Sequence, residues 1–198
     1  MSKENILAKT DIIEDFFKRT TKTEVVLNIM GGELFQDNLL EEFLPVYSEF
    51  IDRIQLLSIQ HNKKPKFNFV TNLLVTRHDL FKEWLIQHEL KLSVSYDLTG
   101  RFNTKQIEIF KDNIEEYRDQ IGLICLVATN PNIQRLLQNS DSYYDYLYQN
   151  FDCYWDQLTP GPTVPTSLVP SEGQYLIFMK HLIDHYPRCT NLEAFTNK

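Results

Sequence analysis

The sequence predicts an α/β fold in which parallel strands alternate with helices. Short apolar runs alternate with longer stretches whose apolar residues recur at helical spacing. One run, Ile121–Ala128, is apolar almost throughout, which is typical of a parallel strand covered on both faces. Small polar or acidic residues follow several runs, and in α/β folds ligands bind at the carboxyl ends of the strands.

The expected elements follow one another in a regular α-then-β order, which favours right-handed crossovers and a parallel sheet. Helices are expected at residues 3–18, 38–60, 79–88, 105–118, 130–148 and 172–186, and strands at residues 24–30, 66–72, 90–97, 121–128 and 151–158. The first helix has a possible break near Thr10, and the fifth has one at 139–141. The stretch from His61 to Pro65 is expected to separate the second helix from its strand.

The composition is that of an ordinary globular protein. The chain has 198 residues, of which 42% are hydrophobic and 24% charged, and its length is compatible with a single domain. Its net charge of -7 argues against nucleic-acid binding, and no apolar run is long enough to cross a membrane. Without the apolar core of a signal peptide at the start, a cytoplasmic location is expected. A Pro-rich loop is expected at 160–170 and a short tail at 187–198.

An apolar stretch that ends in two glycines and a carboxylate organises the chain. Residues 24–30 have the apolar and β-branched character of a buried strand, and Gly31-Gly32-Glu33 follows directly. Glu33 therefore lies at the carboxyl end of a strand, where a lone acid can bind a cationic group such as an amine. The alternative is a simple strand-to-loop turn with a solvated glutamate.

Polar residues also follow the other predicted strands. They are Thr71 and Asn72, Ser95 and Asp97, Thr129 and Asn130, and Asp156. In a barrel or half-barrel the carboxyl ends of the strands converge on one mouth, so this distribution favours a ligand site there.

The residues at these strand ends, taken in their order along the chain, resemble motifs of the radical S-adenosylmethionine (SAM) enzymes. That family has a partial (β/α)6 barrel with a Gly-Gly-Glu motif at the end of its second strand. Gly31-Gly32-Glu33 is similar to this motif, residues 69–72 look like the next strand, and residues 95–102 are similar to the fourth-strand segment of some members. The resemblance extends from the first helix to about Tyr186. It implies a partial parallel (β/α) barrel of radical SAM type, present as one incomplete (β/α)5–6 domain over residues 1–198.

The resemblance implies that SAM is the cofactor and that the polar strand ends hold it. Glu33 and the Gly31-Gly32 backbone would contact the methionine amine, Ser95 the methionine or ribose, and Arg101 the carboxylate. A carboxylate suits an amine, and a forked guanidinium suits a carboxylate. The other candidate cofactor-binding residues are Thr71, Asn72, Asp97, Thr129 and Asn130, the last two near the adenosine, while Asp156 would face the mouth.

Each of these roles has a structural alternative. Arg101 is compatible with an exposed loop position, and the Ser95 hydroxyl with a hydrogen bond to the backbone. Asp97 is equally compatible with a cap of a turn or helix. The sequence leaves these alternatives open.

One departure from the family pattern concerns the cysteines. Members carry a Cys-x3-Cys-x2-Cys loop after the first strand, and its thiolates hold a [4Fe–4S] cluster. Cys125, Cys153 and Cys189 are far apart, and no such motif is present. The first strand and the cluster loop of the family are therefore missing from this sequence.

This absence gives two functional hypotheses. The strand at 24–30 would lack a neighbour, and an open apolar edge favours a protein partner that covers it. The first hypothesis is the cluster-less portion of a split or truncated radical SAM enzyme, inactive alone, with the 4Fe–4S cluster supplied by a partner chain. The alternative is a non-catalytic binding protein derived from the same fold, for which the tyrosines of 143–148 would suit an interface. Those tyrosines equally suit a helix that buries some of its rings.

A third hypothesis, a hydrolase or transferase, has little support. His181 and His185 have the i, i+4 spacing of a helical metal site, but no glutamate lies between them. No metal site is predicted.

Overall fold

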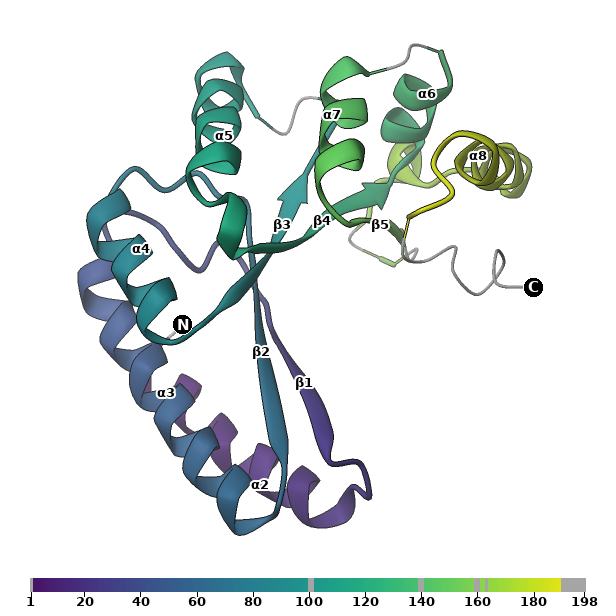
Figure 1. The fold of residues 1–198 in the computed structure, drawn as a ribbon. Helices are drawn as coiled ribbons and strands as arrows, with labels where there is room; N and C mark the ends of the chain where they lie inside the picture. The colour runs from purple at the N-terminus through teal and green to yellow at the C-terminus, as the bar shows by residue number, and fades with distance from the viewer. Residues whose placement is uncertain (1, 100–101, 139–140, 159–160, 163, 190–198) are drawn as a thin grey trace. The chain divides into compact units, whose positions relative to one another are not determined.

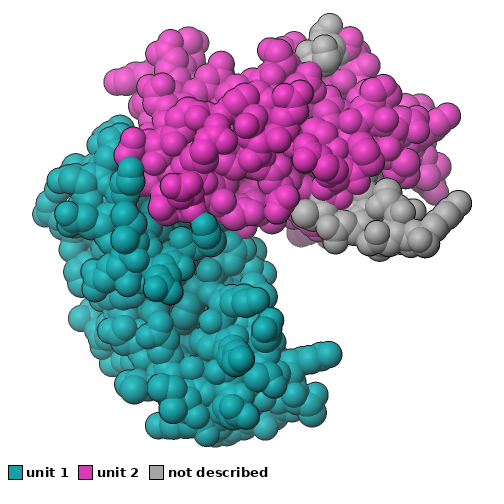
Figure 2. Space-filling view, viewed as in Figure 1, with its two compact units in different colours: residues 1–92 teal, residues 93–198 magenta. Residues whose placement is uncertain are grey.

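Helices and strands alternate along the chain, as the sequence predicts (Figure 1). The computed structural model describes residues 2–99, 102–138, 141–158, 161–162 and 164–189. Its strands follow one another in the order β1-β2-β3-β4-β5, which confirms the predicted α/β class. The chain divides into two units, residues 1–92 and 93–198 (Figure 2).

Unit 1 contains a parallel strand pair covered by helices. Its elements are α1 (Lys3–Leu7), α2 (Lys9–Arg19), β1 (Glu24–Ile29), α3 (Leu40–Gln60), β2 (Lys64–Thr71), α4 (His78–Gln87) and the start of β3 (Lys91–Tyr96). β1 pairs with β2 in parallel register from Glu24↔Lys64 to Ile29↔Phe69. Both α1 and α2 contact α3, and α3 lies beside β2 (Figure 1).

The core of unit 1 is an aromatic cluster. Its members are Phe35, Tyr47, Phe69, Phe81 and Trp84, all at least nine-tenths buried. The Phe35 ring lies 4.6 Å from Phe81, 5.6 Å from Trp84, and 5.8 Å from both Tyr47 and Phe69, measured between ring centroids. Because Phe35 lies two residues after Glu33, this cluster fixes the Gly-Gly-Glu turn against the core.

Two element boundaries in unit 1 differ from the predicted ones. The first predicted helix is two helices that meet at Ala8, rather than near Thr10. β2 begins at Lys64 and includes Pro65, which was expected to lie in the break. A proline lacks a backbone donor but is tolerated near the first residue of a strand. Its partner in the register is Val25.

Unit 2 continues the alternation. It contains the rest of β3, α5 (Thr104–Glu116), a 3₁₀ turn (Arg118–Gln120), β4 (Ile121–Ala128), α6 (Asn130–Gln138), α7 (Ser142–Asn150), β5 (Cys153–Gln157), a second 3₁₀ turn (Thr166–Leu168) and α8 (Glu172–His185). β4 and β5 pair in parallel register. The expected interruption of the fifth helix is confirmed, since Asp141 caps α7 by accepting hydrogen bonds from the Tyr143 and Tyr144 amides.

A buried tryptophan joins the helices of unit 2 to β5. Trp155 is 2% exposed, and its indole N–H donates to the Tyr144 hydroxyl at 2.6 Å. Its ring also packs edge-on against Phe178 of α8, with centroids 4.9 Å apart. Tyr144 is fully buried, so at least this ring of the 143–148 cluster belongs to the core.

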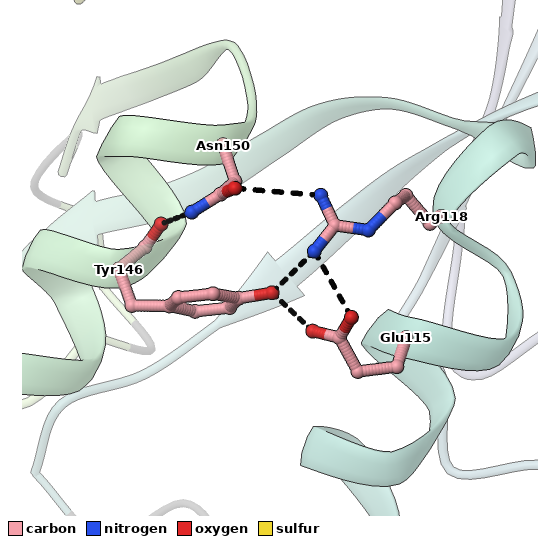
Figure 3. Close-up of polar contacts among 4 residues, drawn as sticks. All are labelled: Glu115, Arg118, Tyr146 and Asn150. Carbon is pink, nitrogen blue, oxygen red and sulfur yellow. Dashed lines mark hydrogen bonds and ion pairs between the residues drawn. The ribbon is translucent and has the colours of Figure 1, made fainter.

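A polar cluster links the end of α5 to α7 (Figure 3). Arg118 donates to Glu115 at 2.9 Å and to the Tyr146 hydroxyl at 2.5 Å, and Tyr146 donates to Glu115. The Tyr146 hydrogen bond, and then Arg118, lower the pKa of the Glu115 carboxyl. Asn150 donates back to the Tyr146 carbonyl at 2.8 Å. A second tyrosine of the 143–148 cluster therefore has partners within the chain.

Within the described residues, no helix combines the length and the apolarity that crossing a bilayer requires.

Candidate functional site

The turn after β1 depends on backbone angles that favour glycine. Gly31 has φ 139° and Gly32 has φ 36°, both in the region that side chains disfavour. The turn brings Glu33 back beside the end of β2 and leaves it half-buried. Glu33 therefore lies in a defined turn just after the carboxyl end of β1, where the sequence predicts it.

The Glu33 carboxylate joins the turn after β1 to the end of β2. Its Oε1 accepts from the Thr71 hydroxyl at 2.7 Å and from the Phe35 amide at 3.0 Å, and its Oε2 accepts from the Asn72 amide at 2.7 Å. The structure thus brings together three of the predicted site residues, Glu33, Thr71 and Asn72. The alternative of a fully solvated glutamate does not describe this side chain.

The same carboxylate retains capacity for a cation. A carboxylate offers about four lone-pair positions, and three donors occupy positions on Glu33. None of the ion pairs formed among the described residues involves Glu33. A half-buried carboxylate without a basic partner is an electrostatic site for an incoming amine.

A cavity of about 250 Å³ lies beside the Gly-Gly-Glu turn. It is lined by Gly31, Gly32, Glu33, Leu34, Gln36, Leu39, Phe43 and Tyr47. Burial, and then the negative charge of Glu33, raise the pKa of the Tyr47 phenol to about 12. The phenol therefore stays neutral near pH 7. An acid at the edge of a largely apolar cavity suits a ligand that has an amine and an apolar chain.

A second polar network lies in unit 2, at the carboxyl ends of β3 and β4. Asp97 accepts from the Thr99 amide at 2.8 Å, and the Thr99 hydroxyl donates to Asn132 at 2.8 Å. Asn132 donates from its side chain to the Val127 carbonyl at 2.9 Å, and its amide donates to the Thr129 hydroxyl at 3.3 Å. Asp97 thus makes the turn-capping contact that the sequence left open. The network connects it with Thr129 through two residues that the sequence analysis did not single out.

The other predicted residues have separate surroundings. Asn130 accepts from Gln174 of α8 at 3.0 Å and donates to the Ser167 carbonyl at 3.5 Å. Ser95 is half-buried on β3, and Asp156 is exposed near the end of β5. Arg101 lies outside the described residues. A cofactor role for Ser95, Asp97, Arg101, Thr129, Asn130 and Asp156 stays a prediction.

Replacing Asn132 with alanine is expected to destabilise unit 2 by about 2 kcal/mol. The Asn132 side chain is fully buried, and its loss leaves the Val127 carbonyl and the Thr99 hydroxyl without their partner in the network. Urea unfolding followed by circular dichroism measures the change. Gln134→Ala, at an exposed position of the same helix, is the control. Equal stability of the two variants would contradict the network's structural role.

The three cysteines do not fit a [4Fe–4S] cluster. Cys125 lies on β4, Cys153 on β5 and Cys189 beyond α8, and the described residues contain no group of three potential metal ligands. Burial, and then Asp156, raise the pKa of the Cys125 thiol to about 11. Burial also raises the pKa of the other two thiols. The three thiols are therefore not grouped in the way that the ligands of a [4Fe–4S] cluster are.

The two histidines of α8 stack on each other instead of meeting a third ligand. The centroids of His181 and His185 are 4.2 Å apart, and burial, followed by His185, lowers the pKa of His181 below 6.5. The folded state therefore favours neutral His181, so its contribution to stability is complete above pH 6.5 and declines as the pH falls below that value. A proton NMR titration is expected to give a His181 midpoint below 6.5; a midpoint above it would contradict the arrangement.

Comparison with known proteins gives a match at the level of structure. No family model and no curated protein matches the sequence. The solved structure described as polyhistidine-tagged anSMEcpe with bound AdoMet matches with a TM-score of 0.59 and 14% identity, over 88% of this chain and 49% of that chain. Native anSMEcpe with bound AdoMet and Cp18Cys peptide matches with a TM-score of 0.60 and 16% identity, over 88% and 50% of the two chains.

The chain therefore spans about half the length of the solved structures that it matches. AdoMet, named in both descriptions, is SAM, and anSMEcpe is a radical SAM enzyme. The likeness extends over most of this chain, at an identity that informs about the fold alone. This protein has the fold of a partial (β/α) barrel of radical SAM type.

Proposed function

We propose that this chain is the cluster-less portion of a radical SAM-type enzyme and that Glu33 binds the amine of SAM. The observation that carries the proposal is the Glu33 carboxylate, which has no basic partner among the described residues and borders a cavity of about 250 Å³. The backbone of the Gly-Gly turn and the apolar wall formed by Leu39 and Phe43 would hold the methionyl chain. Thr71 and Asn72 orient the carboxylate. A cytoplasmic location is part of the same proposal.

The chemistry of such an enzyme needs a group that this chain does not fit. In radical SAM enzymes a [4Fe–4S] cluster supplies the electron that cleaves SAM, and the three buried or half-buried cysteines here lack the required grouping. We therefore propose that a second chain contributes both the cluster and a strand. The role of this chain would be to bind and orient SAM.

The free edge of β1 supports the proposed second chain. β1 is the first strand in the order β1-β2-β3-β4-β5, so its outer edge pairs with no strand of the described part. A cavity of about 680 Å³ is lined by β1 together with residues of α1, α2 and α3. Val26 and Met30, which line it, are 60% and 61% exposed. An open edge with exposed apolar side chains is a template for an added strand.

The ligand part of the proposal is tested by calorimetric titration of the isolated chain. SAM is expected to bind at least about tenfold more tightly than 5′-methylthioadenosine, because that compound lacks the aminocarboxypropyl chain whose α-amine is the proposed partner of Glu33. Equal affinities for the two compounds would contradict the assigned role of Glu33. If the chain binds SAM but purifies from its native source without a partner chain or iron, the alternative, a non-catalytic binding protein, would be favoured.

The partner part is tested by exchanging apolar residues on the edge of β1. The double variant Val26→Lys, Met30→Lys is expected to lose the partner in a pull-down and to keep its fold, since both side chains are already exposed. Ile59→Lys, at a position of α3 that is 78% exposed, is the matched control and should retain the partner. Retention by the double variant would argue against the β1 edge as the site of association.

A further inference from the structure

A long groove runs between α3 and α4 on unit 1, apart from the Gly-Gly-Glu turn. Its volume is about 660 Å³. It is lined by Leu40, Glu41, Leu44, Pro45, Ser48, Glu49, Asp52, Arg53 and Leu56 of α3, and by Leu80, Glu83, Trp84 and Gln87 of α4. These positions recur every three or four residues, so one continuous face of each helix borders the groove.

The floor of the groove is apolar and fixed in place. Leu44 and Trp84 are 3% and 5% exposed, and the Trp84 indole donates to the Ser48 hydroxyl at 3.0 Å. Ser48 is also hydrogen-bonded to His88 at 2.8 Å. At one end of the groove Leu56 is 63% exposed. A preformed apolar floor with an exposed leucine at its end suits the apolar face of an incoming segment.

The rim of the groove is acidic. It carries Glu41, Glu49, Asp52 and Glu83 against Arg53, the one basic residue among the lining residues. Arg53 is paired with Glu49 at 2.6 Å. None of the ion pairs formed among the described residues involves Asp52 or Glu83. These two carboxylates flank the apolar floor from opposite helices.

We infer that this groove binds a basic amphipathic helix of a partner protein. At 1.5 Å per residue the α3 wall extends over about 22 Å from Glu41 to Leu56 and the α4 wall over about 10 Å from Leu80 to Gln87, so about two turns of an incoming helix would lie between both walls. Apolar residues at i, i+3, i+4 and i+7 would fill the floor, and flanking Lys or Arg would pair with Asp52 and Glu83. This inference is independent of the proposed SAM site, because its residues belong to other surfaces of unit 1.

The charge of the groove argues against the other occupants. A second copy of this chain, with its net charge of -7, would meet like charge across the groove. An anionic lipid surface would be repelled by the same rim. An added strand needs an open sheet edge, whereas both walls of the groove are helices.

Fluorescence anisotropy with two labelled peptides tests the inference on the full chain. The probe is a 16-residue Leu/Lys amphipathic helix, and the comparison peptide has every Lys replaced by Glu. The Leu/Lys peptide is expected to bind at least about tenfold more tightly, with an affinity that falls as salt is added. The double variant Asp52→Lys, Glu83→Lys should weaken its binding about tenfold. Leu56→Gln should weaken it about threefold.

Matched controls separate the groove from general attraction to an acidic protein. The double variant Glu42→Lys, Asp79→Lys makes the same charge change at exposed positions of α3 and α4 outside the lining residues, and Ile86→Gln changes a side chain of α4 that is 58% exposed. Both should bind the Leu/Lys peptide within about twofold of the unchanged chain. Equal effects of the groove and control variants would overturn the inference. Dimers that form with rising concentration and are abolished by Leu56→Gln would also overturn the inference, because they assign the groove to a second copy of the chain. Binding to phosphatidylserine vesicles that is strengthened by Asp52→Lys, Glu83→Lys would overturn it as well, because it assigns the groove to a lipid surface.

Discussion

Replacing Glu33 with alanine is expected to reduce SAM affinity about hundredfold and to destabilise unit 1 by about 3 kcal/mol. The affinity falls because the carboxylate is the proposed partner of the amine. The stability falls because three donors, two of them backbone amides and one the Thr71 hydroxyl, lose a charged acceptor. Calorimetric titration measures the first effect, and urea unfolding measures the second.

Thr71→Val separates these two effects. Thr71 is 4% exposed, and its hydroxyl both donates to Glu33 and accepts from the Leu73 amide, so the variant should be destabilised by about 2 kcal/mol. It keeps the carboxylate and the Phe35 and Asn72 backbone amides that also hold it in position, so SAM affinity should stay within about threefold of the unchanged chain. If Glu33→Ala bound SAM as well as Thr71→Val does, the carboxylate would not be the amine's partner.

Replacing Phe35 with alanine is expected to destabilise unit 1 by about 4 kcal/mol. Phe35 is 3% exposed and contacts the rings of four other core residues, so its loss leaves a cavity among large, rigid side chains. Phe16→Ala, at a position of α2 that is 46% exposed, is the control and should change stability by less than about 1 kcal/mol. Chemical denaturation measures both variants, and comparable losses would contradict this view of the core.

The Phe35 variant should also weaken SAM binding: its backbone amide still donates to the Glu33 carboxylate, but the turn that carries Glu33 loses its anchor in the aromatic core. The Gly-Gly-Glu turn is thus held from two sides, by the aromatic core and by the end of β2. The proposed binding of SAM would therefore depend on the position of the Glu33 carboxylate as well as on its charge.

The sequence was sufficient for the fold class and for the proximity of Glu33, Thr71 and Asn72 in unit 1. Parallel strands have their carboxyl ends on the same edge of a sheet, so residues that follow β1 and β2 were expected to meet. Glu33 does accept hydrogen bonds from Thr71 and Asn72. That expectation needed only the strand order and the glycines that reverse the chain.

The unit 2 network was harder to foresee. Asn132 occupies the first turn of α6, where an asparagine ordinarily faces solvent, yet here it is fully buried and joins Thr99 to the end of β4. Its burial follows from tertiary packing, which has no local sequence signal. The helix break at Ala8 was misplaced for a related reason, since neither a glycine nor a proline marks it.

An anaerobic purification of the tagged chain from its native source tests the central proposal most directly. Iron and acid-labile sulfide are quantified in the eluate, and the chains that accompany it are identified. The proposal predicts that iron and sulfide co-purify with a second polypeptide that carries three closely spaced cysteines. A pure chain without iron, sulfide or a partner would contradict it and would leave a SAM-type barrel without SAM cleavage.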